Sequence, residues 1–313
     1  MSRNNLAILL LFHIASSFNL QEQWQAEQFV DFQNPNDFID SSVFNSTQDV
    51  FNESRSRVKE WMKNQTVPGF VFGLTIKGKC VWREGFGHID IENNVETHDK
   101  SVWRLASVTK TLTSALVGQL MERGLLHLNK TINDYLSVEL FPKKTFNGKP
   151  VDITLGQLLS HMAGLHVSQL SDETIPVFKA ANITEHIRRT PFKNEPLNFK
   201  PGTDFSYSNY GFLVVGAIIE AVLNSTYEKE IKKMFDSLGM NLTFCETRQM
   251  IFSHRPRYYQ MSKEGILQNI DIMDDLDVYE AEYSDGGVVS TVEDLLVFGN
   301  AMLSSYYGRN QSK

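Results

Sequence analysis

The chain has 313 residues, of which 42% are apolar and 21% are charged, and its formal net charge at pH 7 is −7. Such a composition is that of a globular protein with one large or two smaller domains, and it argues against wholesale disorder. The negative net charge, without any long block of Lys or Arg, also argues against a nucleic-acid partner, because binding to phosphates requires a basic excess.

The first 17 residues have the pattern of a secretory signal peptide. A short charged start ends at Arg3, an apolar run extends from Leu6 to Ala15, and the small residues Ser16 and Ser17 follow. The run is too short for a comfortable membrane crossing, so we expect no stable membrane span. A buried N-terminal helix is the alternative interpretation. The pattern predicts a secreted protein.

Eight N-x-S/T sequences support secretion, since random placement gives fewer in this length. They begin at Asn45, Asn52, Asn64, Asn129, Asn182, Asn224, Asn241 and Asn310. We expect several of them to be glycosylated surface positions. The two cysteines, Cys80 and Cys245, either form one disulfide or remain as two unpaired buried thiols, and the sequence leaves both options open.

Residues 18–53 are rich in Asn, Gln, Asp and Ser, and we interpret them as a loosely packed leader to a domain that covers residues 54–313. A helix is predicted over 54–64. Apolar and other residues then alternate over 70–76, the period of a β-strand, and a glycine-containing turn leads to a second strand over 80–87. The pattern predicts a β-hairpin.

The next helix is predicted to begin at Ser107 and to end at Gly124, a residue suited to a helix C-terminus. Ser107 and Lys110 are three residues apart and therefore share one helix face. A partly desolvated lysine can take the proton of a serine hydroxyl, and a helix N-terminus offers N–H groups to an oxyanion. An ordinary amphipathic helix is the plainer interpretation. The same S-x-x-K spacing recurs at Ser56 and Lys59, where we assign it no chemical role.

Thr154 is predicted to cap a helix that ends near Met162 and carries His161. We expect His161 to form structural hydrogen bonds rather than to act in catalysis. Together with His166 it lacks a third ligand at a recognisable spacing, so no zinc site is predicted.

Tyr207 and Asn209 follow a Pro-Gly turn and precede a strongly apolar helix. Two residues apart in an extended segment, their side chains can enter one cleft. There a phenol can relay protons and an amide can orient a carbonyl group, although an ordinary half-buried tyrosine is the alternative. A last helix is predicted after Gly286-Gly287, with Thr291 and Asp294 in a capping arrangement.

The motifs, taken in order, resemble those of serine β-lactamases and penicillin-binding proteins. Ser107-Val108-Thr109-Lys110 and Tyr207-Ser208-Asn209 look like the first two signatures of that family. Thr154–Leu165, Pro201-Gly202 and the segment from Gly286 to Leu295 resemble its class C-like branch, and animal serine β-lactamase-like proteins look most similar within it. The resemblance covers roughly residues 58–303. It implies an α+β fold of the β-lactamase/transpeptidase type, with an antiparallel sheet flanked by helices and a helical subdomain.

The resemblance also implies roles for the residues. Ser107 would be the acylated nucleophile, Lys110 its base, Tyr207 a proton relay to the leaving group, and Asn209 the residue that positions the substrate amide. The backbone N–H of Ser107 would supply half of an oxyanion hole. The implied activity is that of a serine hydrolase acting on a peptide or an ester, without a metal or an organic cofactor. Oligomerisation is compatible with this assignment.

Two features depart from the family. Its third signature, Lys or His followed by Thr or Ser and then Gly, occurs nowhere in the chain, so we expect the domain to be truncated before its last strands and its sheet to be incomplete. A catalytically inactive member with a binding or assembly role is therefore the alternative to an enzyme. The secretory N-terminus is the second departure, because the nearest resemblance implies a mitochondrial location.

Overall fold

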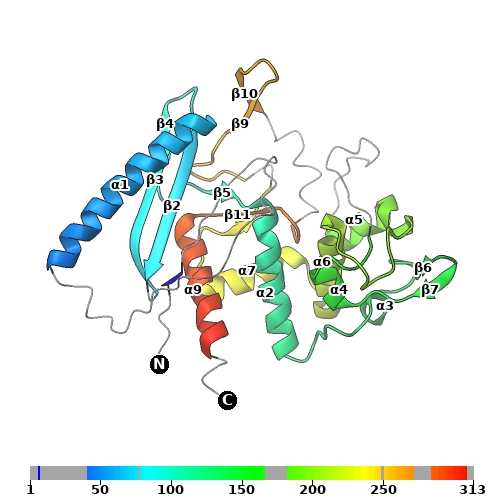
Figure 1. Cartoon of the computed structure of the whole chain (residues 1–313). Coiled ribbons are helices and arrows are strands. Elements are labelled where there is room, and N and C mark those ends of the chain that lie inside the picture. Colours follow the sequence, from blue (N-terminus) through cyan, green and yellow to red (C-terminus); the bar gives the residue numbers. More distant parts are fainter. Residues whose placement is uncertain are drawn as a thin grey trace.

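The computed structural model (Figure 1) describes residues 6–7, 41–76, 78–165, 182–247, 250–270 and 283–308. Helices pack on both faces of an antiparallel hairpin, and a mainly helical part carries small two- and three-stranded sheets. The expected α+β class is confirmed. Apart from Leu6 and Ala7, the signal peptide predicted over residues 1–17 lies outside the described residues.

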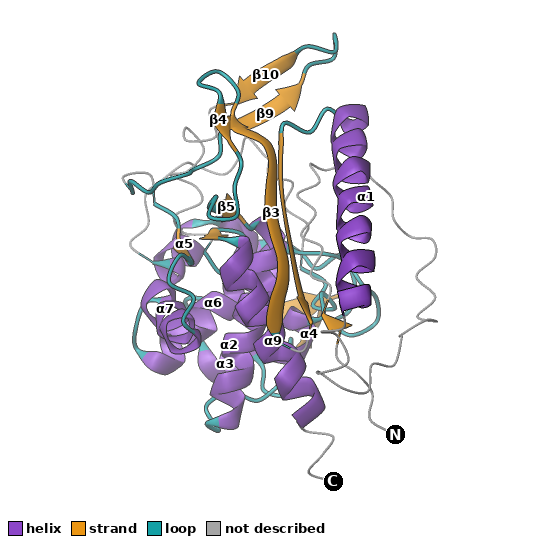
Figure 2. Ribbon diagram, turned by 90° about the vertical axis from the view of Figure 1, so that its left-hand side faces the viewer, coloured by secondary structure: helices purple, strands orange, loops and turns teal. Residues whose placement is uncertain are grey.

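The hairpin layer lies at one side of the molecule, between helix α1 and helix α9 (Figures 1 and 2). Its antiparallel strands run in the order β1–β2–β3–β4, and Phe70 on β2 pairs with Phe86 on β3. Gly78, with a φ of +78°, makes the tight turn of the predicted hairpin. The elements of this layer are α1 (Ser41–Gln65), β1 (Leu6–Ala7), β2 (Gly69–Ile76), β3 (Lys79–Asp90) and β4 (Val95–Glu96).

Helix α1 begins earlier than the sequence analysis predicts. It starts at Ser41, whereas the sequence predicts a helix only from residue 54. Phe51 packs on Trp82 with ring centroids 5.1 Å apart, and Val58 and Trp61 continue the same face over the hairpin. These apolar positions lie one or two turns apart among polar residues, which conceals the periodicity in the sequence.

β2 approaches α9 closely at Gly73. A Cβ atom built on Gly73 would lie 2.6 Å from Val292 Cγ2 and 2.8 Å from Leu296 Cδ1, so glycine is the residue that fits this contact. At its edge away from β3, β2 pairs with β1 only at Thr75 and Ile76. Within the described residues the rest of this edge has no strand beside it. An apolar cleft lies here, lined by Val67, Phe70, Val71, Trp103, Leu105, Val108, Val292 and Leu295.

The main core lies among helices α2, α6, α7 and α9. Its side chains come from the apolar stripes of these helices, for example Leu112, Leu120, Ile218 and Phe235, all fully buried. Smaller helices and a short hairpin cover its far side. The bounds are α2 (Thr109–Glu122), α3 (Ile132–Tyr135), α4 (Leu155–Leu159), α5 (Ile183–Arg189), η3 (Pro191–Asn194), α6 (Asn209–Leu223), α7 (Tyr227–Leu238), α9 (Val292–Gly308), β6 (Lys144–Phe146) and β7 (Lys149–Val151).

A three-stranded sheet holds the chain just before Ser107. Its order is β5 (Trp103–Arg104), β11 (Val288–Ser290) and β8 (Phe244–Cys245), and all pairs are antiparallel. A separate hairpin, β9 (Tyr258–Met261) with β10 (Leu267–Ile270), projects from the molecule (Figure 1). Arg104 is buried and forms an ion pair with the buried Glu246. The sheet therefore fixes the position at which the chain enters the Ser107 turn.

Candidate active site

Ser107 lies in a single 3₁₀ turn, η2 (Ala106–Val108), directly before α2. The predicted helix start is thus right to within two residues, and Gly124, with a φ of +71°, ends the helix as predicted. Ala106 has a φ of +45°, a backbone conformation that costs a residue with a Cβ atom free energy. This turn leaves Ser107 exposed to solvent at the end of a buried helix.

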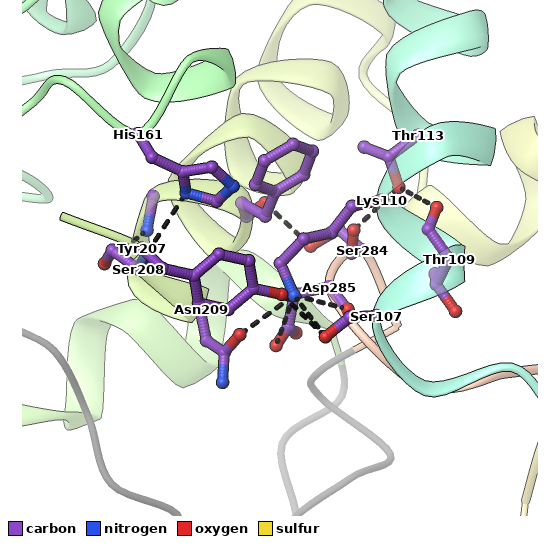
Figure 3. A network of polar contacts seen from close by, with 12 residues as sticks. Ser107, Thr109, Lys110, Thr113, His161, Tyr207, Ser208, Asn209, Ser284 and Asp285 are labelled. Carbon is purple, nitrogen blue, oxygen red and sulfur yellow. Dashed lines mark hydrogen bonds and ion pairs between the residues drawn. The ribbon is translucent and has the colours of Figure 1, made fainter. Parts of the chain in front are cut away.

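Lys110 is buried on the first turn of α2, and its ammonium group has three acceptors (Figure 3). Nζ donates to Ser107 Oγ at 3.2 Å, to Asn209 Oδ1 at 2.8 Å and to the backbone oxygen of Asp285 at 2.8 Å. An ammonium has three N–H groups, so this set uses all of them. Residues from three distant parts of the sequence therefore hold one amine beside one hydroxyl.

Tyr207 also contacts Ser107. Its hydroxyl donates to Ser107 Oγ at 2.6 Å, and its ring lies 5.0 Å from Lys110 Nζ. Ser208 accepts a hydrogen bond from the N–H of Gly211 and caps α6, so Asn209 is the first helical residue. Tyr207 and Asn209, two residues apart at the start of α6, thus contact Ser107 and Lys110 respectively.

The segment before Tyr207 is fixed to the end of α4. The N–H of Gly202 donates to the carbonyl of Met162 at 2.8 Å, and the N–H of Ser206 donates to the carbonyl of His161 at 3.0 Å. Gly202 has a φ of +83°, as the predicted Pro-Gly turn requires. Thr154 and Gln157 form the capping box that starts α4.

His161 is not on the helix, contrary to prediction. α4 ends at Leu159, and His161 has a φ of +58° in the turn that follows. Its Nδ1 accepts from the N–H of Ser208 at 3.2 Å, and its ring lies 4.4 Å from that of Tyr207. Burial, and then the charge of Lys110, lower the pKa of His161. These contacts let a neutral imidazole support the Tyr207 ring.

Asp285 is a member of the site to which the sequence analysis gives no role. Its side chain is buried, with Oδ2 3.9 Å from Lys110 Nζ, and burial raises its pKa to about 7 against the opposing effect of the Lys110 charge. The sequence offers one signal, an acidic residue that directly precedes two glycines and two valines. Nothing in that pattern shows which side chain the acid faces.

The second S-x-x-K sequence lies outside the site. Ser56 and Lys59 are exposed on α1, and Ser56 Oγ donates to the backbone oxygen of Asn52. Its lysine is therefore hydrated, whereas Lys110 is buried. The comparison separates a lysine that can act as a base from one that is an ordinary surface charge.

The structure also bears on the two cysteines, on possible metal ligands and on helices that could cross a membrane. Cys80 is exposed and Cys245 is buried, and both are free thiols. Among the described residues no group of three or more His, Cys, Asp or Glu side chains is placed to bind a metal ion, and His166 lies outside them. In the same part of the chain no single helix is long and apolar enough to cross a membrane, and α6 and α7 meet that criterion only as a pair bent by 85°.

Of the eight predicted glycosylation positions, five are exposed. They are Asn52, Asn64, Asn129, Asn224 and Asn241. Asn182 is half-buried and its side chain caps α5. The side chains of Asn45 and Asn310 lie outside the described residues.

Comparison with known proteins adds to the geometry. A family profile described as Beta-lactamase matches residues 55–311. The human protein "Serine beta-lactamase-like protein LACTB, mitochondrial" is 30% identical over 302 residues, which are 76% of this chain and 54% of the human protein. The chain spans about half the length of the curated relatives it matches.

Solved structures give the same fold. The octameric penicillin-binding protein homologue from Pyrococcus abyssi has a TM-score of 0.68 and 26% identity, and the match covers 80% of this chain and 55% of that chain. A class C beta-lactamase in complex with cefoxitin has a TM-score of 0.62 and 19% identity, with 80% and 64% covered. The family resemblance inferred from the motifs is confirmed.

Proposed function

The chain belongs to the beta-lactamase family, and on this basis we propose that it is a serine hydrolase which forms an acyl-enzyme on Ser107 from a peptide or an ester. One observation carries the proposal. Lys110 Nζ and Tyr207 OH both contact Ser107 Oγ, at 3.2 Å and 2.6 Å, although Tyr207 is 100 residues away in the sequence. This is the arrangement that a serine needs to lose its proton and that a leaving group needs to gain one.

The proposed reaction begins with attack of Ser107 Oγ on the carbonyl carbon of the acyl donor while Lys110 takes the proton. The bond between that carbon and the leaving nitrogen or oxygen then breaks. Tyr207 relays a proton to the leaving group, so the proton lost by Ser107 departs with the first product. Water then attacks the acyl carbon and gives up one proton to Lys110, the bond between that carbon and Ser107 Oγ breaks, and the proton passes to Oγ as the acid leaves. The N–H of Ser107 is the proposed donor to the oxyanion.

Asn209 has the proposed role of substrate binding. Its Oδ1 already accepts from Lys110 at 2.8 Å, which orients the amide and leaves its N–H₂ group available as a donor to a substrate. A carbonyl oxygen of the substrate is the partner that such a donor fits. Asn209 would therefore position both the base and the acyl donor.

A fluorophosphonate probe, which reacts covalently with activated serines, tests the proposal. We expect labelling of the wild type at Ser107 and none in Ser107→Ala, read by mass spectrometry of the labelled peptide. Ser56→Ala is the matched control, because it removes the serine of the other S-x-x-K sequence from an exposed helix face, and it should leave labelling unchanged. A folded wild-type protein that the probe does not label would disprove the proposed activity.

A non-catalytic role is the second candidate. It is favoured by one observation, the absence from the chain of the Lys/His-Thr/Ser-Gly signature. Such a member would bind or assemble without turnover, and the octameric state of the Pyrococcus abyssi homologue supports assembly as its form. This candidate predicts a folded chain that multi-angle light scattering finds to be oligomeric and that the probe leaves unlabelled.

For the location we propose secretion. The apolar run from Leu6 to Ala15 and the five exposed glycosylation positions support it, whereas the human relative, which is named as mitochondrial, supports a mitochondrial alternative. Expression in an animal cell line separates the two. Protein in the medium whose mass falls on treatment with an N-glycosidase supports secretion, and unglycosylated protein in the mitochondrial fraction overturns it.

A further inference from the structure

The inference concerns Asp285 and depends on the proposed function of Ser107 and Lys110. Asp285 lies beside Lys110, shortly before β11 begins at Val288 (Figure 3). Its backbone oxygen accepts from Nζ at 2.8 Å and its carboxylate Oδ2 lies 3.9 Å from the same nitrogen. One residue thus holds the amine by its main chain and places a charge beside it.

The carboxylate has few other partners. The side chain is 4% exposed, and within the described residues its Oδ1 is buried without a hydrogen-bond partner. A buried carboxylate without compensating contacts is strongly disfavoured in its charged form. The ammonium of Lys110 is the group that compensates it, so the protonation states of the two side chains depend on each other.

Other titratable groups face this pair from two sides. His161 and Tyr207 lie on the Lys110 side, and the pKa of His161 is lowered by burial and then by Lys110. Tyr227 on α7 lies on the Asp285 side. Its pKa is raised by burial, then by Cys245 on β8, and also by Asp285. These pKa shifts favour the uncharged forms of His161, Tyr227 and Cys245, so among these groups the carboxyl of Asp285 is the one whose ionisation acts on the charge of Lys110.

We propose that Asp285 is a positioning residue that sets the pH at which Lys110 can accept the proton of Ser107. The ionised carboxylate stabilises the ammonium form, and an ammonium cannot act as a base. Removal of the negative charge therefore lets the amine lose its proton at a lower pH. Activation itself stays the same step, in which the proton of Ser107 Oγ passes to Lys110 Nζ as the bond to the acyl carbon forms.

The test is the pH dependence of the rate at which the fluorophosphonate probe labels Ser107 in the whole chain. Asp285→Asn keeps the shape of the side chain and the backbone acceptor but removes the charge. We expect the midpoint of the rise in labelling rate with pH to move to lower pH by about 1 to 3 units. A loss of packing alone would lower the rate without moving the midpoint, so the shift distinguishes the proposal from a structural role.

Asp294→Asn is the matched control. Asp294, near the start of α9, is also buried, and burial also raises its pKa. Its carboxylate, however, accepts hydrogen bonds from the Thr243 hydroxyl and from the N–H of Leu242. This variant should be less stable and should keep the wild-type midpoint. An Asp285→Asn protein with an unchanged midpoint overturns the inference, whereas an unlabelled wild type overturns the proposed function instead.

Asp285→Ala is a second variant that removes the same charge with a smaller side chain, and it should shift the midpoint in the same direction. If neither variant folds, carbon-13 NMR of the wild type decides. The inference then requires the Lys110 side chain and an aspartate carboxyl to titrate together. Independent titration of the two groups overturns it.

Discussion

At the scale of single residues, Tyr207 combines a short hydrogen bond with high exposure. Its hydroxyl is 2.6 Å from Ser107 Oγ while its side chain is 41% exposed. An exposed side chain contributes little to the core, and one hydrogen bond contributes about 0.5–1.5 kcal/mol of stability. The hydroxyl therefore matters far more to the chemistry than to folding.

Tyr207→Phe tests this separation. We expect the labelling rate at Ser107 to fall by about 10²- to 10⁴-fold, the range for loss of a positioned proton donor or acceptor, with a change in unfolding free energy of about 1 kcal/mol or less. Labelling kinetics and thermal melting measure the two effects. Tyr135→Phe is the control, since its hydroxyl contacts only the backbone of His127, and it should label at the wild-type rate. Equal rates for both variants would refute the role of Tyr207.

The site could be predicted from sequence only in part, and the residues show why. Ser107 and Lys110 are neighbours on one helix turn, so their spacing alone predicts a shared face. Asp285 is 175 residues from Lys110, and only the tertiary fold brings them together. The support that His161 gives to Tyr207 likewise depends on a left-handed backbone conformation that no helical periodicity indicates.

At the scale of secondary-structure elements, the contact between β2 and α9 depends on the missing side chain of Gly73. The nearest atoms to a Cβ at this position are side-chain methyl groups, which can move apart only in part because α9 is packed on the main core. Overpacking of this kind costs about 1–3 kcal/mol. The close packing of β2 against α9 therefore depends on glycine at this one position.

Gly73→Ala is expected to lower the unfolding free energy by about 1–3 kcal/mol, measured by urea titration. Gly118→Ala is the control, because a Cβ on this α2 residue would meet nothing within 4 Å. Alanine in a helix interior should raise stability by about 0.5–1 kcal/mol over glycine. If both variants are stabilised, the close approach of α9 to β2 is not a constraint.

Some of the helices and turns could be predicted from the sequence and others could not. The hairpin, the Gly124 end of α2 and the Thr154 cap follow from short-range chemistry and are confirmed. The first three turns of α1 were missed because tertiary packing on Trp82 stabilises a stretch whose own composition resembles a loop. Local patterns predict best where turn and cap residues determine the structure.

At the scale of the whole molecule, the described chain has two separate apolar clusters. The small one, between α1 and the hairpin, contains Met62, Phe70 and Phe86 with Trp61 and Trp82 packed against it. The large one holds the helices around the Ser107 site. Because a small cluster buries less apolar surface, its layer should have the lower local stability.

We therefore expect urea to detach the α1 and hairpin layer before the helical core unfolds. In a Trp24→Phe, Trp103→Phe protein the remaining tryptophans, Trp61 and Trp82, both belong to the small cluster. Their fluorescence should change at a lower urea concentration than the concentration at which labelling of Ser107 is lost. Coincident transitions would show a single cooperative unit instead.

The length of the β2 edge that has no strand beside it in the described part of the chain has a consequence for the protein at high concentration. A strand edge with free N–H and C=O groups is a template for the edge of another strand, and the groups beside it here are apolar, from Val67 and Phe70 to Leu295. Two copies that meet edge to edge would satisfy these groups mutually. High protein concentration is then a condition that favours association of copies through the β2 edge.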